Sequence, residues 1–471
     1  MTAIESEFRR PDRPPLPPTA RGAGAARPLA TPAPSRLLDT DLGAVLGGFA
    51  VVVVGLWIRH GEAGRLFDGW LGFWTSLSQL SGLLAAAAGL LGLTLVARPR
   101  SVERRYGLDR MFVWHRILGE TMAVLVGAHV VAGTAEWAVG GSLWSAVRDA
   151  TGREPYMAGA FVGSLLVGLV TITSLRSIRR RMAYETWYFV HLLAYVGLAL
   201  SFSHEIVVGG DLADDRWART FWVLAHVGVA AWIVWGRWGH LVQAALRPLK
   251  VTGITNLNNN TVELRIGGPG IEKITADAGQ FMLLRPLHGR LWWQTHPFSL
   301  SGAPNTDGLR FTIKARGDAS AAMTSLPVGT RVVVEGPYGA CTPEVIGDDK
   351  VLFVVGGVGI APVRAMLERL GPSAAPIVLY RAHSTKDLVH LDELQALVAA
   401  RNGVVHTLVG PTAKLKVKDP FSARVLRKLT PDVAARVAVL CGPERLLHAA
   451  RAGLKEAGVP LDRIHYERVW W

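Results

Sequence analysis

The apolar stretch FVWHRILGETMAVLVGAHVVAGTA, residues 112–135, carries two histidines 14 residues apart, His115 and His129. In a helix this step rises about 21 Å and falls only ~40° short of four turns, so both imidazoles share one face near opposite membrane surfaces. A second apolar stretch holds His191 and His204. Its 13-residue step rises ~19.5 Å but falls ~140° short of four turns, so a regular helix presents this pair less well. The two stretches predict parallel helices that hold two stacked haems.

Working outward, six apolar stretches are long enough to cross a hydrocarbon layer of ~30 Å, at roughly 20 residues each. They are residues 41–59, 73–97, 112–135, 156–175, 185–206 and 219–240. After Pro248 the pattern changes to short strands and amphipathic helices. The sequence thus predicts a six-helix transmembrane domain followed by a soluble half.

The net charge of +14 is explained by topology rather than by nucleic-acid binding. Residues 1–36 carry six arginines, the 98–110 loop five and the 176–181 loop four, whereas the three alternate loops carry two each. Positively charged loops stay on the cytoplasmic side. We therefore expect a multi-pass protein of the cell membrane, in contact with its lipid, with a cytoplasmic N-terminus and soluble half. The first histidine of each pair then lies near the inner surface and the second near the outer one.

Ionisable residues are costly inside a bilayer, so histidine in a span indicates function, and neutral imidazole is a standard axial ligand of haem iron. An interfacial or structurally satisfied histidine is the alternative, but matched depths on two helices favour ligation. His226 and His240 are also 14 residues apart on the sixth stretch, where structural roles are favoured. Arg59 and His60, at the outer end of the first stretch, could face an acceptor site or simply the lipid interface.

The soluble half shows two patterns. Alternating segments in residues 250–345, such as Thr261 to Ile266 and Leu309 to Lys314, predict a small antiparallel barrel. The apolar run at 351–355 is typical of a buried parallel strand, and a glycine-rich loop with a helix follows it. Such a loop can bind phosphate, although a plain strand-to-helix turn would look similar. Further strands at 376–380, 404–409 and 436–440 alternate with helices, which predicts a doubly wound α/β domain.

The two cysteines, Cys341 and Cys441, exclude two classes of site. A disulfide scaffold needs more cysteines. A plant-type [2Fe–2S] cluster needs four thiolates, so no iron–sulfur cluster is expected.

With its histidine spacings on the third and fifth of six helices, the membrane half resembles the ferric reductase transmembrane domain shared by NADPH oxidases and ferric-chelate reductases. The resemblance implies two b-type haems, one ligated by His115 and His191 and the other by His129 and His204. Members of this family also have a 13-residue spacing between the two histidines of the fifth helix, as between His191 and His204. Members often place an aromatic residue between the haems where this chain has Gly197, so any bridge would need another side chain, such as Tyr195.

Residues 250–471 resemble the ferredoxin–NADP reductase superfamily. The resemblance implies that FAD lies along the segment His296, Pro297, Phe298 and Ser299, with Ser299 near the reactive nitrogen as a catalytic residue. Histidine at position 296 is typical of the oxidase-like branch. Ser320, at a predicted helix start, would meet the FAD pyrophosphate. Of the two C-terminal aromatics, Trp470 or Trp471 could cover the flavin ring, or both could be loose at a strand edge.

The same resemblance implies a nicotinamide nucleotide site built from two loops. Catalytic Cys441 would lie near the nicotinamide, unless it is only a small buried residue at a strand end. Arg381 could bind a 2′-phosphate and select NADPH, but a solvated arginine would leave NADH equally acceptable. The loop residues implied in binding are Gly356, Gly357, Gly359, Pro362, Gly442 and Pro443.

Together these features predict a multi-domain membrane oxidoreductase. Its regions are a disordered cytoplasmic arm (1–36), a six-helix di-haem domain (37–245), an FAD-binding β-barrel (246–346) and an NAD(P)H-binding α/β domain (347–471). We expect electrons from cytosolic NAD(P)H to pass through FAD and the haems to an outer acceptor, either oxygen, giving superoxide, or a ferric chelate. The alternative is a haem-free, membrane-anchored flavin reductase whose helices dock a partner subunit.

Overall fold

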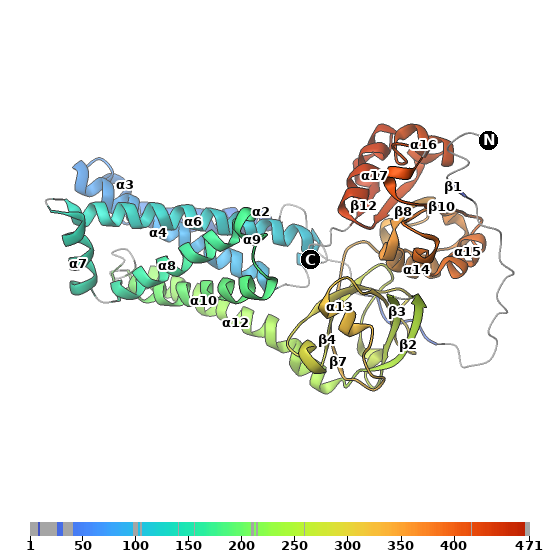
Figure 1. Ribbon diagram of the computed structural model, residues 1–471. Helices are drawn as coiled ribbons and strands as arrows, with labels where there is room; N and C mark the ends of the chain where they lie inside the picture. The colour runs from blue at the N-terminus through green and yellow to red at the C-terminus, as the bar shows by residue number, and fades with distance from the viewer. Residues whose placement is uncertain are drawn as a thin grey trace. The chain divides into compact units, whose positions relative to one another are not determined.

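The computed structural model describes residues 8–9, 26–31, 41–97, 102–103, 106–139, 141–154, 156–208, 212, 215–258, 260–415 and 417–466. Two compact units result (Figure 1). One is helical and comprises residues 36–105 and 110–238. The other contains the strands and comprises residues 1–35, 106–109 and 239–471.

The described helices before residue 250 are α2 (Asp41–Arg59), α3 (Glu62–Arg65), α4 (Gly69–Val96), α6 (Leu108–Ala138), α7 (Leu143–Arg153), α8 (Met157–Ser174), α9 (Arg176–Arg179), α10 (Tyr184–Val207) and α12 (Arg216–Leu246). Within the described residues, five helices are long and apolar enough to span a membrane, with cores in α4, α6, α8, α10 and α12. The first predicted span corresponds to the shorter apolar helix Gly43–Arg59, so six spans remain a prediction.

A glycine contact joins α8 and α10. A Cβ atom on Gly163 would lie 2.6 Å from the Gly197 carbonyl oxygen, and one on Gly197 would lie 3.0 Å from the Gly163 carbonyl oxygen. Small residues allow membrane helices to approach at backbone distance. The residue at position 197 is therefore glycine for a packing reason, and an aromatic side chain does not fit there.

Two three-stranded antiparallel sheets, in the orders β2-β3-β6 and β5-β4-β7, enclose one apolar core. Isolated bridges between Leu300 and Phe311 and between Lys250 and Arg331 link them. This arrangement agrees with the predicted antiparallel domain, while full closure into a barrel remains a prediction. The bounds are β2 (Lys250–Asn258), β3 (Thr261–Gly267), β4 (Phe281–Pro286), β5 (His296–Ser299), β6 (Leu309–Lys314) and β7 (Val332–Tyr338), with the short helix α13 (Asp318–Met323).

The remaining sheet has the order β1-β10-β9-β8-β11-β12, parallel except for β1. Alternate strand residues pack on α14 and α15 at one face and on α16 and α17 at the other, which is the predicted doubly wound arrangement. The strand order reverses at β8, so the carboxyl ends of β8 and β11 flank the expected ligand crevice. The bounds are β8 (Val351–Gly356), β9 (Ile377–Ala382), β10 (Val404–Val409), β11 (Val437–Cys441), β12 (Ile464–Tyr466), α14 (Ile360–Arg369), α15 (Leu391–Ala399), α16 (Ala423–Leu429) and α17 (Glu444–Glu456).

Two pieces of the arm predicted to be disordered have defined partners. The short strand β1 (Phe8–Arg9) pairs with β10. Leu29 is buried in the core of the two antiparallel sheets, and Pro28 bridges to Asn305. Apolar side chains and free backbone groups in these pieces find partners on the folded domains, which composition alone did not reveal. The rest of residues 1–36 lies outside the described residues.

Candidate functional site

The helices α6 and α10 bring four histidines together as two pairs. The ring centres of His115 and His191 lie 6.1 Å apart, and those of His129 and His204 lie 5.9 Å apart. The rings are inclined at 74° in the first pair and 41° in the second. Since α10 stays helical throughout Tyr184–Val207, side-chain orientation accommodates its 13-residue step.

Hydrogen bonds indicate which ring nitrogen of each histidine carries the proton. The Nδ1 atoms of His115, His129 and His204 donate to the carbonyl oxygens of Gly92 (3.1 Å), Ser78 (2.8 Å) and Ser201 (2.5 Å). A carbonyl can only accept, so Nδ1 carries the proton and Nε2 keeps its lone pair. The fourth, His191, has Nδ1 3.5 Å from Ser174 Oγ. Metal-ligating histidines characteristically anchor their other nitrogen in this way.

The ring separations also fit an iron atom between each pair. A metal–imidazole bond is about 2 Å long, and the ring centre lies about 1.1 Å behind its nitrogen, so two coaxial ligands place their ring centres roughly 6.2 Å apart. The observed 6.1 and 5.9 Å agree with this value. The donor set, bis-imidazole in an apolar bundle, is one that haem iron accepts.

Helix α4 makes room for the imidazoles, a role that the sequence interpretation missed. A Cβ on Gly82 would lie 2.8 Å from His129 Nδ1, and one on Gly92 would lie 3.6 Å from His115 Nδ1. Between them, Gly89 lies against Met122 and Leu198, which fill the level between the histidine pairs. Glycines at steps of seven and three residues share one helix face. That spacing was the available signal.

We expect Gly82→Ala to weaken haem binding at the His129–His204 pair selectively. The added methyl group displaces the His129 ring and its bond to Ser78, and loss of such an orienting bond typically lowers metal affinity 10–100-fold. Haem content per flavin, measured during growth on limiting haem, checks this. Gly119→Ala is the control, because a Cβ there meets no described heavy atom within 4 Å. Full haem content and an unaltered haem reduction potential in Gly82→Ala would contradict the assignment.

A cavity of about 440 Å³ borders the second pair. This is ligand-sized. His129, His204 and the half-buried side chain of Glu205 line it. Trp222 Nε1 donates to Glu205 Oε2 at 2.8 Å, and His226 Nε2 lies 3.8 Å from the same oxygen. His226 is thus part of a local polar cluster, in agreement with a structural role.

Arg59 and His60, at the carboxyl end of α2, also have local partners. Arg59 Nη2 and His60 Nε2 lie 3.3 and 3.2 Å from Asp215 Oδ2. The other oxygen of Asp215 accepts the backbone N–H groups of Trp217 and Ala218, which lower the pKa of this carboxyl group together with Arg59 and His60. The cluster caps α12, so the arrangement favours a structural role over an acceptor site.

The predicted flavin segment forms the whole of β5. This strand pairs with β4, and all four of its residues are half-buried. The pairs are His296 with Leu284, Pro297 with Leu283, Phe298 with Met282 and Ser299 with Phe281. His296 Nε2 lies 3.1 Å from Gln294 Oε1. A half-buried strand offers a surface along which a planar ring can lie, so the geometry is compatible with the predicted role.

Ser320 has a defined position at the start of α13. Its hydroxyl accepts the N–H groups of Arg316 (2.8 Å) and Gly317 (3.0 Å) and donates to the Gly317 carbonyl (2.9 Å). The side chain therefore shapes this turn. Its contact with a pyrophosphate remains a prediction.

At the carboxyl ends of β8 and β11, two loops meet at backbone distance. A Cβ on Gly359 would lie 2.4 Å from the Cys441 carbonyl oxygen, and one on Gly442 would lie 3.1 Å from Gly356 N. Gly357 has a φ of +56°, a left-handed conformation suited to glycine. Pro362 lies in the first turn of α14, and Pro443 precedes α17. The structure thus brings all predicted nucleotide-loop residues together, with half-exposed Cys441 beside them.

Three further predicted residues have other outcomes. The Arg381 guanidinium donates to the carbonyl oxygens of Ala382, Leu408 and Gly410, so it is held by the backbone rather than solvated. Selection of NADPH by this residue remains a prediction. Trp471 and Trp470 lie outside the described residues.

Comparison with known proteins divides the chain in the same way. Residues 81–202 match the family of the ferric reductase like transmembrane component, residues 247–342 an FAD-binding domain, and residues 353–452 an oxidoreductase NAD-binding domain. The 3-ketosteroid-9-alpha-monooxygenase ferredoxin reductase component of Mycolicibacterium smegmatis is 31% identical over 42% of this chain and 56% of its own length. The propane 2-monooxygenase reductase component of Rhodococcus jostii is 26% identical over 46% of this chain and 62% of its own length.

A third relative also extends into the membrane half. Ferric reductase transmembrane component 3 of Saccharomyces cerevisiae is 24% identical over 64% of this chain and 41% of its own length. The chain thus spans 41–62% of the length of these three relatives. The chain has the architecture of the fused ferric reductase and NADPH oxidase family, a ferric reductase-like transmembrane domain followed by a ferredoxin reductase-type FAD-binding and NAD-binding module.

Proposed function

We propose that this protein oxidises NAD(P)H and passes the electrons through FAD and two b-type haems to an acceptor across the cell membrane. The observation that carries the proposal is the two histidine pairs, with ring centres 6.1 and 5.9 Å apart and Nδ1 anchored on the bundle. When bound, FAD would accept the two electrons of a hydride, whereas haem iron takes them singly.

The residues of this chain would bind and align the cofactors. His115 and His191 would hold one haem, and His129 and His204 the other. The β5 segment with Ser299 would lie along the flavin, and the loops around Gly359 and Cys441 would present the nicotinamide. Two histidines would ligate each haem, which would then supply outer-sphere electron transfer to the acceptor, oxygen or a ferric chelate.

The arginine-rich N-terminus and the 98–110 and 176–181 loops support a cytoplasmic position for the flavin module. In proteoliposomes, external NADPH or NADH should then reduce an entrapped ferric chelate only when the module faces outward. Protease accessibility of the module gives the fraction in that orientation. Reduction that follows the opposite orientation would contradict the topology.

The purified protein should contain two haems per FAD and show the sharp reduced-minus-oxidised bands of bis-histidine haem b. NADPH and NADH oxidation, measured with oxygen or with a ferric chelate, identifies the donor and the acceptor. Superoxide dismutase distinguishes direct iron reduction from reduction by superoxide. A flavoprotein that binds no haem would overturn the proposal in favour of a membrane-anchored flavin reductase.

A further inference from the structure

Strand β6 has two chemically different faces. Leu309, Phe311 and Ile313 are completely buried in the core of the antiparallel sheets. Arg310, Thr312 and Lys314 alternate with them and so lie on the opposite face. Such a face usually meets water. Here it meets the nucleotide-binding domain.

Three side-chain contacts follow one another along this face. Lys314 Nζ lies 2.7 Å from Asp387 Oδ1, Thr312 Oγ1 lies 2.8 Å from His390 Nε2, and Arg310 Nη2 lies 3.6 Å from Glu393 Oε2. The partner residues Asp387, His390 and Glu393 are spaced three apart, from the turn before α15 into its first turn. They run along the chain in the direction opposite to their β6 partners. We call these three contacts the β6 ladder.

Further charged side chains surround the Arg310–Glu393 contact of the ladder. Arg310 also forms an ion pair with Glu263 of β3, and Arg364 of α14 forms one with Glu393. The side chains of Glu263 and Arg364 are each only 4% exposed. Burial raises the pKa of Glu263, but Arg310 and Arg265 outweigh this effect, and its pKa lies below the usual range. The nearby His390 lowers the pKa of Glu393, assisted by Arg364 and Arg310 against the effect of burial.

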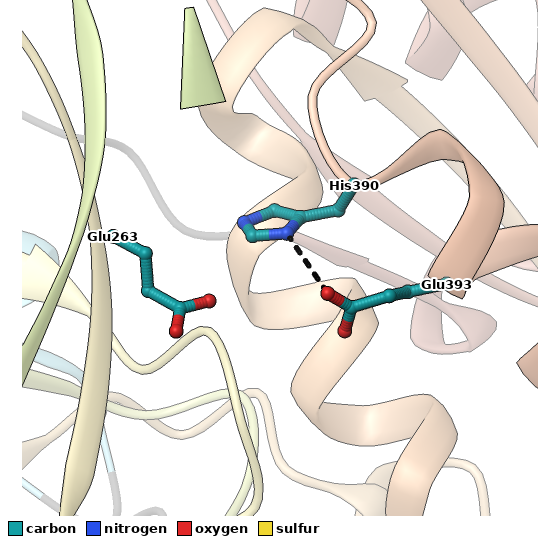
Figure 2. Close-up of side chains that lie close together, drawn as sticks. All are labelled: Glu263, His390 and Glu393. Carbon is teal, nitrogen blue, oxygen red and sulfur yellow. Dashed lines mark ion pairs between the residues drawn. The ribbon is translucent and has the colours of Figure 1, made fainter. Parts of the chain in front are cut away.

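Glu263, His390 and Glu393 lie close enough to suggest a metal site (Figure 2). Their surroundings argue against it. Each carboxylate already pairs with a guanidinium group, Glu263 with Arg310 and Arg265, and Glu393 with Arg364 and Arg310. A divalent cation would have to displace these arginines or lie beside their positive charge. The cluster is therefore an ionic contact between the two domains.

Arg364 connects this contact to both predicted cofactor sites. It lies on α14, the helix that begins directly after Gly359 of the nucleotide loop. Its Nη1 donates to the Ser301 carbonyl at 2.5 Å, two residues after Ser299 of the flavin segment. The neighbouring residue Leu300 bridges to Phe311 of β6. The nucleotide loop, the flavin segment and the β6 ladder thus share one short, buried connection.

We propose that the β6 ladder and Arg364 are positioning residues that set the register of the nicotinamide against the flavin for hydride transfer. The inference rests on the proposed NAD(P)H-to-FAD reaction. A displacement of about 1 Å between reacting groups can cost roughly 100-fold in rate. Complementary charges at an interface fix register and exclude wrong alignments more than they add affinity.

Charge reversal in the full-length protein tests the ladder. Lys314 and Asp387 are suited to this because both side chains are partly exposed, 22% and 23%. We expect Lys314→Glu and Asp387→Lys each to slow single-turnover flavin reduction by NADPH about tenfold. The double reversal should restore most of the rate. Lys273→Glu, at an exposed position of the same flavin domain, applies an equal charge change and should leave the rate unaltered.

A second readout separates positioning from folding. FAD content, the flavin absorption spectrum and haem reduction by dithionite should be the same in all these variants. Lys314→Gln, which only neutralises the charge, should show a smaller decrease in rate than Lys314→Glu. Wild-type rates in both single reversals, or equal slowing without recovery in the double reversal, would overturn the ladder. Wild-type flavin that NAD(P)H does not reduce would instead refute the proposed function.

Added Zn²⁺ or Mg²⁺ tests the metal alternative in the same samples. We expect no change in melting temperature or in flavin reduction at ion concentrations up to about 1,000-fold above that of the protein. This range reaches the order of millimolar, where even a weak metal site would be saturated. A saturable rise in melting temperature that Glu393→Gln abolishes would assign the cluster to a metal and overturn the ionic contact.

Discussion

Replacement of His129 by leucine is expected to remove one haem and to stop electron transfer across the bundle. Leucine offers no lone pair, so His204 loses its partner across the 5.9 Å ring separation. We expect haem content to fall from two per FAD towards one. Transfer to an entrapped acceptor should fall by about 100-fold or more, because loss of a group that only orients a ligand already costs roughly 10–100-fold. Flavin reduction by NADPH should continue, because β5 and the nucleotide loops lie in the other unit.

His226→Gln is the matched control, since it also changes a histidine within a span but one that pairs with Glu205 rather than with another imidazole. Reduced-minus-oxidised spectra and haem extraction give the stoichiometry of both variants. Two haems per FAD and unaltered transfer in His129→Leu would exclude this residue as a ligand.

Gly359→Ala is expected to block the opposite end of the electron path. The new Cβ would lie 2.4 Å from the Cys441 carbonyl oxygen and 2.7 Å from its carbonyl carbon. Both are backbone atoms, so the two nucleotide loops must separate. We expect kcat/KM for NAD(P)H to fall about 100-fold, the cost of misplacing a reacting group by roughly 1 Å. FAD and haem content should not change, and dithionite should still reduce the haems.

Gly371→Ala provides the comparison within the same domain, because a Cβ there meets only Ser373 Oγ, at an ordinary 3.8 Å. Stopped-flow reduction of the bound flavin measures both variants. A Gly359→Ala protein with the wild-type kcat/KM would show that the nucleotide does not use this pair of loops.

The two matched depths of the four histidines could be predicted from local patterns, whereas their pairing as ligands was implied by the family resemblance. Hydrophobic length identified the helices, the arginines suggested their directions, and the histidine spacing placed the rings at two levels. The contribution of α4 could not be predicted in this way. Ser78 and Gly92 bind the histidines through backbone carbonyls, and every residue type carries such a group. The only sequence signal for this role of α4 is the spacing of the glycines at 82, 89 and 92, which places them on one helix face.

The β6 ladder shows a related limit. Alternation in Leu309 to Lys314 correctly predicts a strand with one buried face. The polar face is equally compatible with water and with polar partners 73 to 83 residues later in the chain. The complementary residues Asp387, His390 and Glu393 follow a different, three-residue spacing, so no single periodicity links the two segments.

The glycine contact between α8 and α10 restricts which side chains position 197 can carry. An aromatic residue there would require α8, with Gly163, to move away from α10. The level between the histidine pairs is instead filled by Met122 and Leu198, which both contact Gly89. Neither side chain contains a conjugated ring. In the proposed function, electron transfer between the two levels would depend on the spacing that helix packing imposes rather than on a bridging aromatic ring.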